Sequence, residues 1–267
     1  MSGPIITLLS DFGTRDGYVA AMKGVLLSRA PGATVVDAAH DIPPHDVAAA
    51  AWTLGQYWRF FPPGTIHVAV VDPDVGTARA ILLVVADSHI FLAPDNGLLT
   101  WVLRQARHVA LKRLKKDVHR EKCSATFHGR DIYAHAAGLL AAGRACVDDL
   151  AEDIRELVLP AWAAVERTGE GLRGMIVHVD RFGNLITNLS RHQALESVGA
   201  AFTATAGNFA GIPARRTYGE SKPGELIALF GSSDTLELAV NGGSAAERTG
   251  LARGASVLLR SSLVIEG

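Results

Sequence analysis

The 267-residue chain has only two cysteines and almost no net charge. Neither Cys123 nor Cys146 has a second cysteine at CxxC spacing, so the sequence shows neither a zinc-binding pattern nor a redox motif. The 26 Lys and Arg residues oppose 27 Asp and Glu residues, a net charge of −1 that argues against a nucleic-acid partner. No apolar run approaches the roughly 18 residues that cross a bilayer. We therefore expect a cytoplasmic protein with no membrane partner.

The first half of the chain alternates short β-rich runs with Ala-rich stretches of helical character. The continuous apolar runs are typical of central strands that are covered on both faces. This alternation predicts an α/β domain with a mostly parallel central sheet. The expected strands are residues 5–9, 34–37, 65–71 and 80–86, and the expected helices are residues 18–29, 46–58, 98–107 and 132–142.

The second half of the chain has almost no helix-like segments. Gly, Ser and Asn turns separate strand-like runs, which predicts a smaller all-β domain, either a barrel or a sandwich. The residue pattern changes near residue 165, where helix-like segments nearly disappear. We therefore expect an α/β domain over residues 1–165 and a β domain over residues 166–267. The expected strands of this half are residues 175–179, 225–230, 235–240 and 256–263.

Polar segments follow several of the expected strands, where ligands bind in open α/β sheets. Each also has a purely structural explanation: Asp11 or Asp16 caps a helix or turn, residues 72–79 form a Pro/Gly turn, and His128 lies at the surface. The functional alternative for Asp11 is a carboxylate that grips a ribose diol. No HxxxH, HxH or paired-carboxylate spacing is present, so we expect no metal.

Two polar segments also interrupt the expected strands of the second half. Asp180 and Asn184 lie in the first, where a hairpin turn is the structural alternative, and Glu237 lies in the second, where it faces water before a glycine turn. Small residues after Glu237 would also let a planar base approach the backbone, and the Asn184 amide could read the edge of such a base.

Seven segments, taken in this order, resemble the S-adenosyl-L-methionine hydroxide adenosyltransferases, the SAM hydrolases related to fluorinase and chlorinase. The resemblance covers nearly the whole chain, and the ordered set is far more specific than any single segment. The segments are LSDFGTRDG at 9–17, HDIPP at 40–44, VDPDVGTAR at 71–79, APDNG at 93–97, FHGRD at 127–131, FGNLITN at 182–188 and LELAVNGG at 236–243.

The resemblance implies hydrolysis of S-adenosylmethionine to adenosine and L-methionine by attack of water on the ribose C5′, without a metal or other cofactor. It implies a homotrimer with sites between the first domain of one subunit and the second domain of the next, and a preference for the (R)-sulfonium epimer. The catalytic residues would be Asp72, Arg79 and His128. Asp11 would hold the ribose, Asn184 and the Val240 backbone would meet adenine, Tyr218 or Phe209 would stack on it, and Asp16, Asp180, Ser232 and Glu237 would lie near the polar parts of the substrate.

The chain departs from the family pattern at Asp74, where the family usually has Gly, and at Ala80, where a second basic residue is common. An inward-pointing Asp74 would alter substrate preference or pH dependence. Three alternatives stay open. They are a sensor that binds S-adenosylmethionine or adenosine without turnover, a halide-dependent adenosyl transferase, and a metal-dependent phosphohydrolase built on Asp11, Asp72, Asp74 and His128. Because the halogenating relatives lack the Asp, Arg and His set, hydrolysis is favoured.

Overall fold

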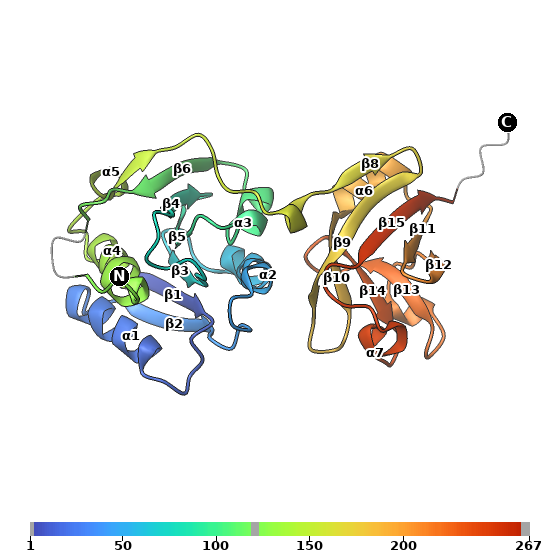
Figure 1. Cartoon of the computed structure of the whole chain (residues 1–267), viewed down its shortest axis with the longest axis horizontal. Coiled ribbons are helices and arrows are strands. Elements are labelled where there is room, and N and C mark those ends of the chain that lie inside the picture. Colours follow the sequence, from blue (N-terminus) through green and yellow to red (C-terminus); the bar gives the residue numbers. More distant parts are fainter. Residues whose placement is uncertain (1–2, 119–122, 263–267) are drawn as a thin grey trace. The chain divides into compact units, whose positions relative to one another are not determined.

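The computed structural model describes residues 3–118 and 123–262. The chain divides into two compact units, Met1–Leu159 and Pro160–Gly267, which we describe separately (Figure 1). Leu263, the last residue of the final expected strand, lies outside the described residues. Across the described ranges, no helix is both long and apolar enough to span a membrane.

The first unit is built on a seven-stranded sheet in the order β2-β1-β3-β5-β4-β6-β7. Four neighbouring strands run parallel and form its central part, while the other three add antiparallel pairs at one side, so the expected α/β fold with a mostly parallel central sheet is confirmed. The parallel strands are β1 (Ile5–Ser10), β2 (Thr34–Ala39), β3 (Ile66–Val70) and β5 (His89–Pro94). The added strands are β4 (Ile81–Ala86), β6 (Val109–Leu114) and β7 (Ala151–Asp153).

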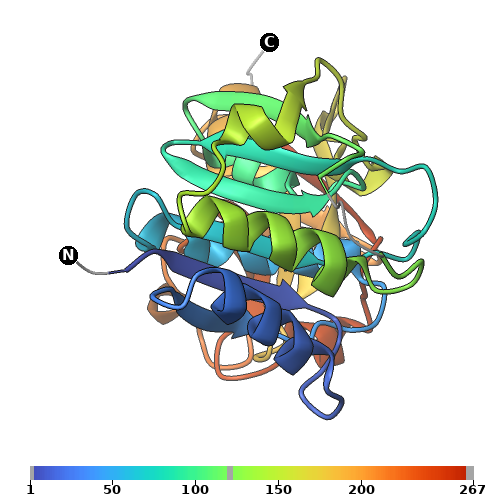
Figure 2. The same ribbon diagram turned by 90° about the vertical axis from the view of Figure 1, so that its left-hand side faces the viewer.

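Helices pack on both faces of this sheet because its side chains alternate between two apolar layers. Leu8 of β1 lies in the core with helices α1 (Tyr18–Arg29) and α4 (Ala134–Ala141). The next residue, Leu9, lies in the opposite core with α2 (Val47–Tyr57) and α3 (Thr100–Gln105). Figure 2 shows α1 and α4 together over one face. The short helices η1 (Trp58–Phe60) and α5 (Val147–Leu150) complete the unit.

The expected helix over residues 132–142 begins earlier than its pattern indicates. Residues Gly129–Tyr133 form a π-helical turn, η2, directly before α4. The residue pattern there does not indicate a π-helix, which is rare, occurs mostly as a single turn within an α-helix and is frequent at functional sites. The turn begins immediately after His128, so its backbone helps to position this candidate catalytic residue.

A chain of buried polar side chains crosses the sheet between β1, β3 and β5. His67 Nδ1 lies 2.8 Å from Thr7 Oγ1, and His67 Nε2 lies 3.2 Å from His89 Nδ1. The His67 ring stacks on Phe91 at 4.8 Å between centroids. Burial, with a smaller contribution from His89, lowers the pKa of His67 to about 3. The folded chain therefore holds His67 neutral at physiological pH.

We expect acidification to destabilise the first unit through His67. The unfolded imidazole takes up a proton below its ordinary pKa near 6.5, whereas the folded one resists protonation down to pH about 3. Stability conferred above pH 6.5 is thus lost as the pH falls toward 3, by about 2 kcal/mol between pH 7 and pH 5. Urea unfolding followed by tryptophan fluorescence at both pH values measures this loss. The loss of stability should shrink in His67→Gln and persist in the control His108→Gln, at an exposed histidine. Equal losses in the two variants would show that His67 is not the group responsible.

The second unit is an antiparallel sheet whose strands follow the order β12-β11-β15-β9-β10-β14-β13, with β8 paired to β9. A bridge between Ala214 and Ala228 links the two ends of this order and nearly closes the sheet into a barrel, as one of the two expected all-β forms requires. Its strands are β8 (Glu166–Thr168), β9 (Gly171–Val179), β10 (Leu185–Ser190), β11 (Phe202–Ala206), β12 (Phe209–Pro213), β13 (Leu226–Phe230), β14 (Thr235–Val240) and β15 (Ser256–Ser261).

Two α-helices interrupt the barrel where the sequence pattern suggested almost none. Helix α6 (Arg191–Val198) is capped by Ser190, whose Oγ accepts the Gln193 amide at 3.2 Å while Gln193 reaches back to Ser190. This capping box is a local start signal that outweighs the weak apolar periodicity. Helix α7 (Ala245–Thr249) begins after Ser244, and the 3₁₀ turns η3 (Ala161–Ala163) and η4 (Tyr218–Glu220) lie in connections.

Candidate active site

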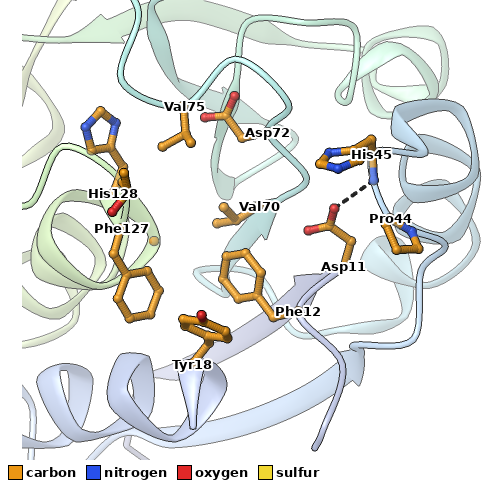
Figure 3. A pocket seen from close by; sticks show the side chains of 12 residues that line it. Asp11, Phe12, Tyr18, Pro44, His45, Val70, Asp72, Val75, Phe127 and His128 are labelled. Atoms are coloured by element: carbon orange, nitrogen blue, oxygen red, sulfur yellow. Dashed lines mark hydrogen bonds between the residues drawn. The ribbon is translucent and has the colours of Figure 1, made fainter. Parts of the chain in front are cut away.

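A cavity of about 320 Å³ opens in the first unit beyond the carboxyl ends of β1 and β3 (Figure 3). This is the edge where ligands bind in open α/β sheets. Three of the residues singled out from the sequence, Asp11, Asp72 and His128, line it together although they come from distant segments. Asp16 and Asp74 are exposed and are not among its lining residues. The structure thus brings together the catalytic candidates and Asp11 but leaves Asp16 apart.

Asp72 and Arg79 form an ion pair at this cavity, with side chains only 4% and 12% exposed. One guanidinium nitrogen donates to Asp72 Oδ2, and Nη1 donates to the Ala80 carbonyl at 3.0 Å. The other carboxylate oxygen, Oδ1, is buried and has no hydrogen-bond partner among the described residues. Burial raises the pKa of Asp72, and Arg79 and the Asp74 amide offset part of that rise. Asp72 therefore keeps one acceptor oxygen without a donor among the described residues, and its raised pKa favours uptake of a proton.

His128 stands between two carboxylates, with electrostatic interactions to both Asp72 and Asp131. Asp131 is held in turn by the Ser124 amide at 2.8 Å and by Arg130. Gly129, the residue after His128, packs closely against two side chains. A Cβ at Gly129 would come within 3.2 Å of the Phe12 ring and 3.3 Å of Met22 Sδ. The close approach of η2 to α1 positions His128 at the cavity.

Asp11 is fixed by the loop that follows β2. Its Oδ2 accepts the His45 amide at 2.9 Å, and His45 has a positive φ of 66°. The Gly13 amide donates to the His40 carbonyl at 2.8 Å. These bonds join the β1–α1 and β2–α2 loops on either side of the carboxylate. Neither Asp11 nor Asp16 caps α1, since the N-cap is Gly17 and no side chain caps the helix. The interpretation of either residue as the cap of this helix is therefore wrong.

A hydrogen-bonded relay of Ser10, His40 and Asp37 supports the loop that carries Asp11. Ser10 Oγ lies 2.8 Å from His40 Nδ1, and His40 Nε2 lies 3.0 Å from Asp37 Oδ1. Ser10 Oγ also accepts the Phe12 amide at 3.3 Å. Asp37 bonds to Lys23 at 2.5 Å. Ser10 and His40 are buried, so this Ser, His and Asp series orients the loop and offers no accessible nucleophile.

Removing the His40 side chain should weaken ligand binding at Asp11 more than it slows chemistry. We expect His40→Ala to raise the Kd for adenosine about 5- to 30-fold, because the Asp11 loop loses the hydrogen bond that orients it through Ser10 and binding must then order it, a cost of about 1–2 kcal/mol. We expect kcat to change less than twofold. Isothermal titration calorimetry and steady-state kinetics measure the two quantities. The control Lys23→Met removes only the exposed end of the relay and should behave as wild type. A loss confined to kcat would contradict this role.

The second unit brings together four of its six side chains named from the sequence. Asp180 Oδ1 accepts the amides of Phe182 and Asn184, both at 2.9 Å, and Asp180 Oδ2 accepts the Asn184 side-chain amide at 2.8 Å. The Tyr218 hydroxyl donates to Glu237. Burial raises the pKa of Glu237, and the nearby Asp180 charge raises it further. Glu237 is only 7% exposed, so the alternative in which it faces water is wrong.

The remaining candidates of this unit lie outside that cluster. Ser232 is exposed in the turn between β13 and β14, next to Gly231, where a Cβ would meet Glu237 Oε2 at 2.5 Å. The Val240 carbonyl at the end of β14 accepts the Gly243 amide at 3.1 Å. Phe209 packs against the barrel core, which leaves Tyr218 as the more accessible aromatic of the two.

The sequence reasoning missed Phe182. Its side chain is 75% exposed in the β9–β10 turn, two positions before Asn184, and aromatic rings exposed beside polar groups are typical of binding sites. The signal available in the sequence was an aromatic residue within an otherwise polar turn, Asp-Arg-Phe-Gly-Asn.

Within the described ranges, no three His, Cys, Asp or Glu side chains are grouped so that they could hold a metal ion. Three residues of the phosphohydrolase alternative, Asp11, Asp72 and His128, line the cavity, but the fourth, Asp74, is exposed and is not among the lining residues, and Asp72 is paired with Arg79. That alternative therefore gains no support from the geometry.

Comparisons with known proteins agree across both units. Residues 6–150 match the model of the SAM hydroxide adenosyltransferase N-terminal domain, and residues 174–258 match that of the C-terminal domain. An (R)-S-adenosyl-L-methionine hydrolase from Thermus thermophilus is 41% identical over 264 residues, covering 95% of this chain and 98% of the relative. A fluorinase from Nocardia brasiliensis is 31% identical, covering 96% and 97%. The crystal structure of an uncharacterized conserved protein from Thermotoga maritima superimposes with a TM-score of 0.82 at 27% identity, covering 96% and 99%.

Proposed function

Because the chain belongs to the SAM hydroxide adenosyltransferase family, we propose that it hydrolyses S-adenosylmethionine to adenosine and L-methionine, with preference for the (R)-sulfonium epimer. The observation that carries this proposal is the buried Asp72–Arg79 pair, of which Asp72 lines one cavity together with His128 and Asp11. Relatives named (R)-S-adenosyl-L-methionine hydrolase support both the reaction and the epimer.

The reaction needs a nucleophile but no acid for the leaving group. As the water oxygen bonds to the ribose C5′, the C5′–S bond breaks and its electron pair returns to sulfur, so methionine leaves as a neutral thioether. The proton of the water passes to the Asp72 carboxylate or to His128, a general-base step worth about 10²–10⁴-fold. Arg79 keeps its charge and stabilises hydroxide character on the oxygen. Alignment of water with the C5′–S bond supplies about 7–11 kcal/mol more.

The remaining site residues have binding roles in this proposal. Asp11 holds the ribose hydroxyls, and the Asn184 amide, which Asp180 orients, reads adenine together with the Val240 backbone. Tyr218 or the exposed Phe182 stacks on the base. Glu237, together with Asp16 and Ser232, which are exposed outside the cavity lining, would meet the polar ends of the substrate.

We further propose that the protein is a homotrimer in which the first unit of one subunit and the second unit of another share a substrate. Mixing tests this arrangement. Asp72→Asn and Asn184→Ala chains, refolded together, should regain activity that neither has alone, because some shared sites then contain both intact halves. Light scattering reports the oligomeric state, and a monomer or an absence of recovery would contradict the proposal.

The decisive experiment for the reaction uses water labelled with ¹⁸O. Purified protein is incubated with a mixture of both sulfonium epimers, with EDTA and without added halide, and the products are resolved by chiral chromatography and mass spectrometry. Attack at C5′ places ¹⁸O in the adenosine 5′-hydroxyl and none in methionine, with the (R)-epimer consumed first. Tight adenosine binding without turnover would instead identify a sensor. Turnover only with chloride or fluoride, giving 5′-halo-adenosine, would identify a halide transferase.

A further inference from the structure

Three aromatic rings from three separate segments meet at one side of the cavity. Phe12 follows β1, Tyr18 is the first residue of α1, and Phe127 precedes η2. The ring centroids of Tyr18 lie 5.8 Å from Phe12 and 5.3 Å from Phe127, and those of Phe12 and Phe127 lie 6.0 Å apart. All three rings line the cavity, and Figure 3 shows them together while Asp11, Asp72 and His128 surround the rest of it.

The geometry of this aromatic cluster is suited to a cation. Phe12 and Tyr18 are tilted by 52°, and Phe127 meets each of them edge to face, at 76° and 85°. Because no pair is stacked, each ring keeps surface for another partner. The Arg130 guanidinium already lies 5.0 Å from the Phe127 centroid. Tyr18 is 49% exposed, whereas Phe12 and Phe127 are partly buried, so Tyr18 is the ring most accessible to a ligand.

We propose that this aromatic cluster binds the sulfonium centre of the substrate and that Tyr18 determines the selectivity for a cationic sulfonium over a neutral thioether. The inference rests on the proposed function. If Asp11 holds the ribose and C5′ faces Asp72 and His128, the sulfur bonded to C5′ comes within reach of the three rings, which form one side of the same cavity. A ring face attracts a cation without forming a covalent or ionic bond to it.

The aromatic wall also explains how the cavity favours substrate over product. The sulfonium charge is lost as the C5′–S bond breaks, so the attraction to the rings is present for the substrate and absent for the thioether of methionine. The interaction is already weaker in the transition state than in the ground state. Its removal should therefore raise KM and leave kcat unchanged or slightly higher.

The test compares two stable adenosine ligands in the full-length protein by calorimetry. One is S-adenosylhomocysteine, a neutral thioether, and the other is an analogue with a protonated amine at the sulfonium position. In Tyr18→Leu, we expect the Kd of the cationic ligand to rise about 3- to 30-fold more than that of the thioether, the range of a cation–π contact. Tyr18→Phe keeps the ring and should stay within twofold of wild type. Phe60→Leu, at an 87% exposed aromatic outside the cavity lining, is the matched control.

Equal weakening of both ligands in Tyr18→Leu and in Phe127→Leu would overturn the inference, because it would show an apolar contact with no dependence on charge. Turnover of S-adenosylmethionine by the wild type separates this result from a failure of the proposed function. If turnover persists while both ligands weaken equally, only the sulfonium assignment is wrong. If the wild type neither turns over the substrate nor prefers the cationic ligand, both are wrong.

Discussion

Replacing Asp72 by asparagine should lower kcat by about 10²–10⁴-fold, the contribution of a positioned general base. Asparagine keeps the shape of the side chain and can still accept from Arg79, but it cannot take a proton from water. Adenosine binding should change little, because Asp11 and the second-unit residues hold the nucleoside in our proposal. Rapid-quench kinetics for kcat and calorimetry for adenosine give the two measurements. The matched control is Asp74→Asn, at the exposed carboxylate two positions along the same loop, which should keep near wild-type activity.

The pH profile provides an independent measure of the same group. Asp72 acts as a base only when ionised, so activity falls as the pH drops through its pKa. Burial raises that pKa above its ordinary value of 3.8, so the acid limb of kcat should lie at higher pH than an ordinary aspartate would give. Retention of wild-type kcat in Asp72→Asn, or an equal loss in Asp74→Asn, would assign the proton transfer elsewhere, with His128 as the next candidate.

Replacing Arg79 by methionine should remove activity and also destabilise the fold. The guanidinium is the cation that offsets the burial of Asp72, and breaking a buried pair by removing one partner costs about 3–5 kcal/mol. Loss of a preorganised charge at the nucleophile lowers kcat by a further 10²–10³-fold or so. Urea unfolding and steady-state kinetics measure the two effects.

The dependence of the Arg79→Met effects on pH has a definite sign. Without the guanidinium, burial raises the pKa of Asp72 further. An acid whose folded pKa lies above its unfolded value loses stability as the pH rises from about 4 toward the folded pKa. The variant should therefore be closer to wild type in stability at pH 5 than at pH 8, while its remaining activity should rise with pH. The double variant with Asp72→Asn removes the unpaired charge and should be more stable than Arg79→Met at pH 8. The opposite order would show that Arg79 acts by packing alone.

Local patterns in the sequence predicted the secondary structure closely where they were strong. The helix expected over residues 18–29 is α1 with the same bounds, and β1 differs from its expected strand by one residue. Capping and turn geometry account for the errors. The capping box at Ser190 begins a helix that apolar periodicity does not indicate, and the π-helical turn at Gly129 depends on close packing against Phe12 and Met22.

The sequence by itself determined the α/β and β halves of this protein, the seven motif segments, and the pair Asp72 and Arg79, because these features depend on residues close together in the chain. Only the tertiary structure decided that Asp11 and His128 meet that pair at one cavity, since the parallel strand order and the approach of η2 to α1 bring distant segments to one sheet edge. It also decided that Glu237 is buried against Tyr218 and that Phe12, Tyr18 and Phe127 converge. Burial and long-range contact, which raise the pKa of Asp72 and assemble the aromatic wall, are properties of packing that no local pattern of residues contains.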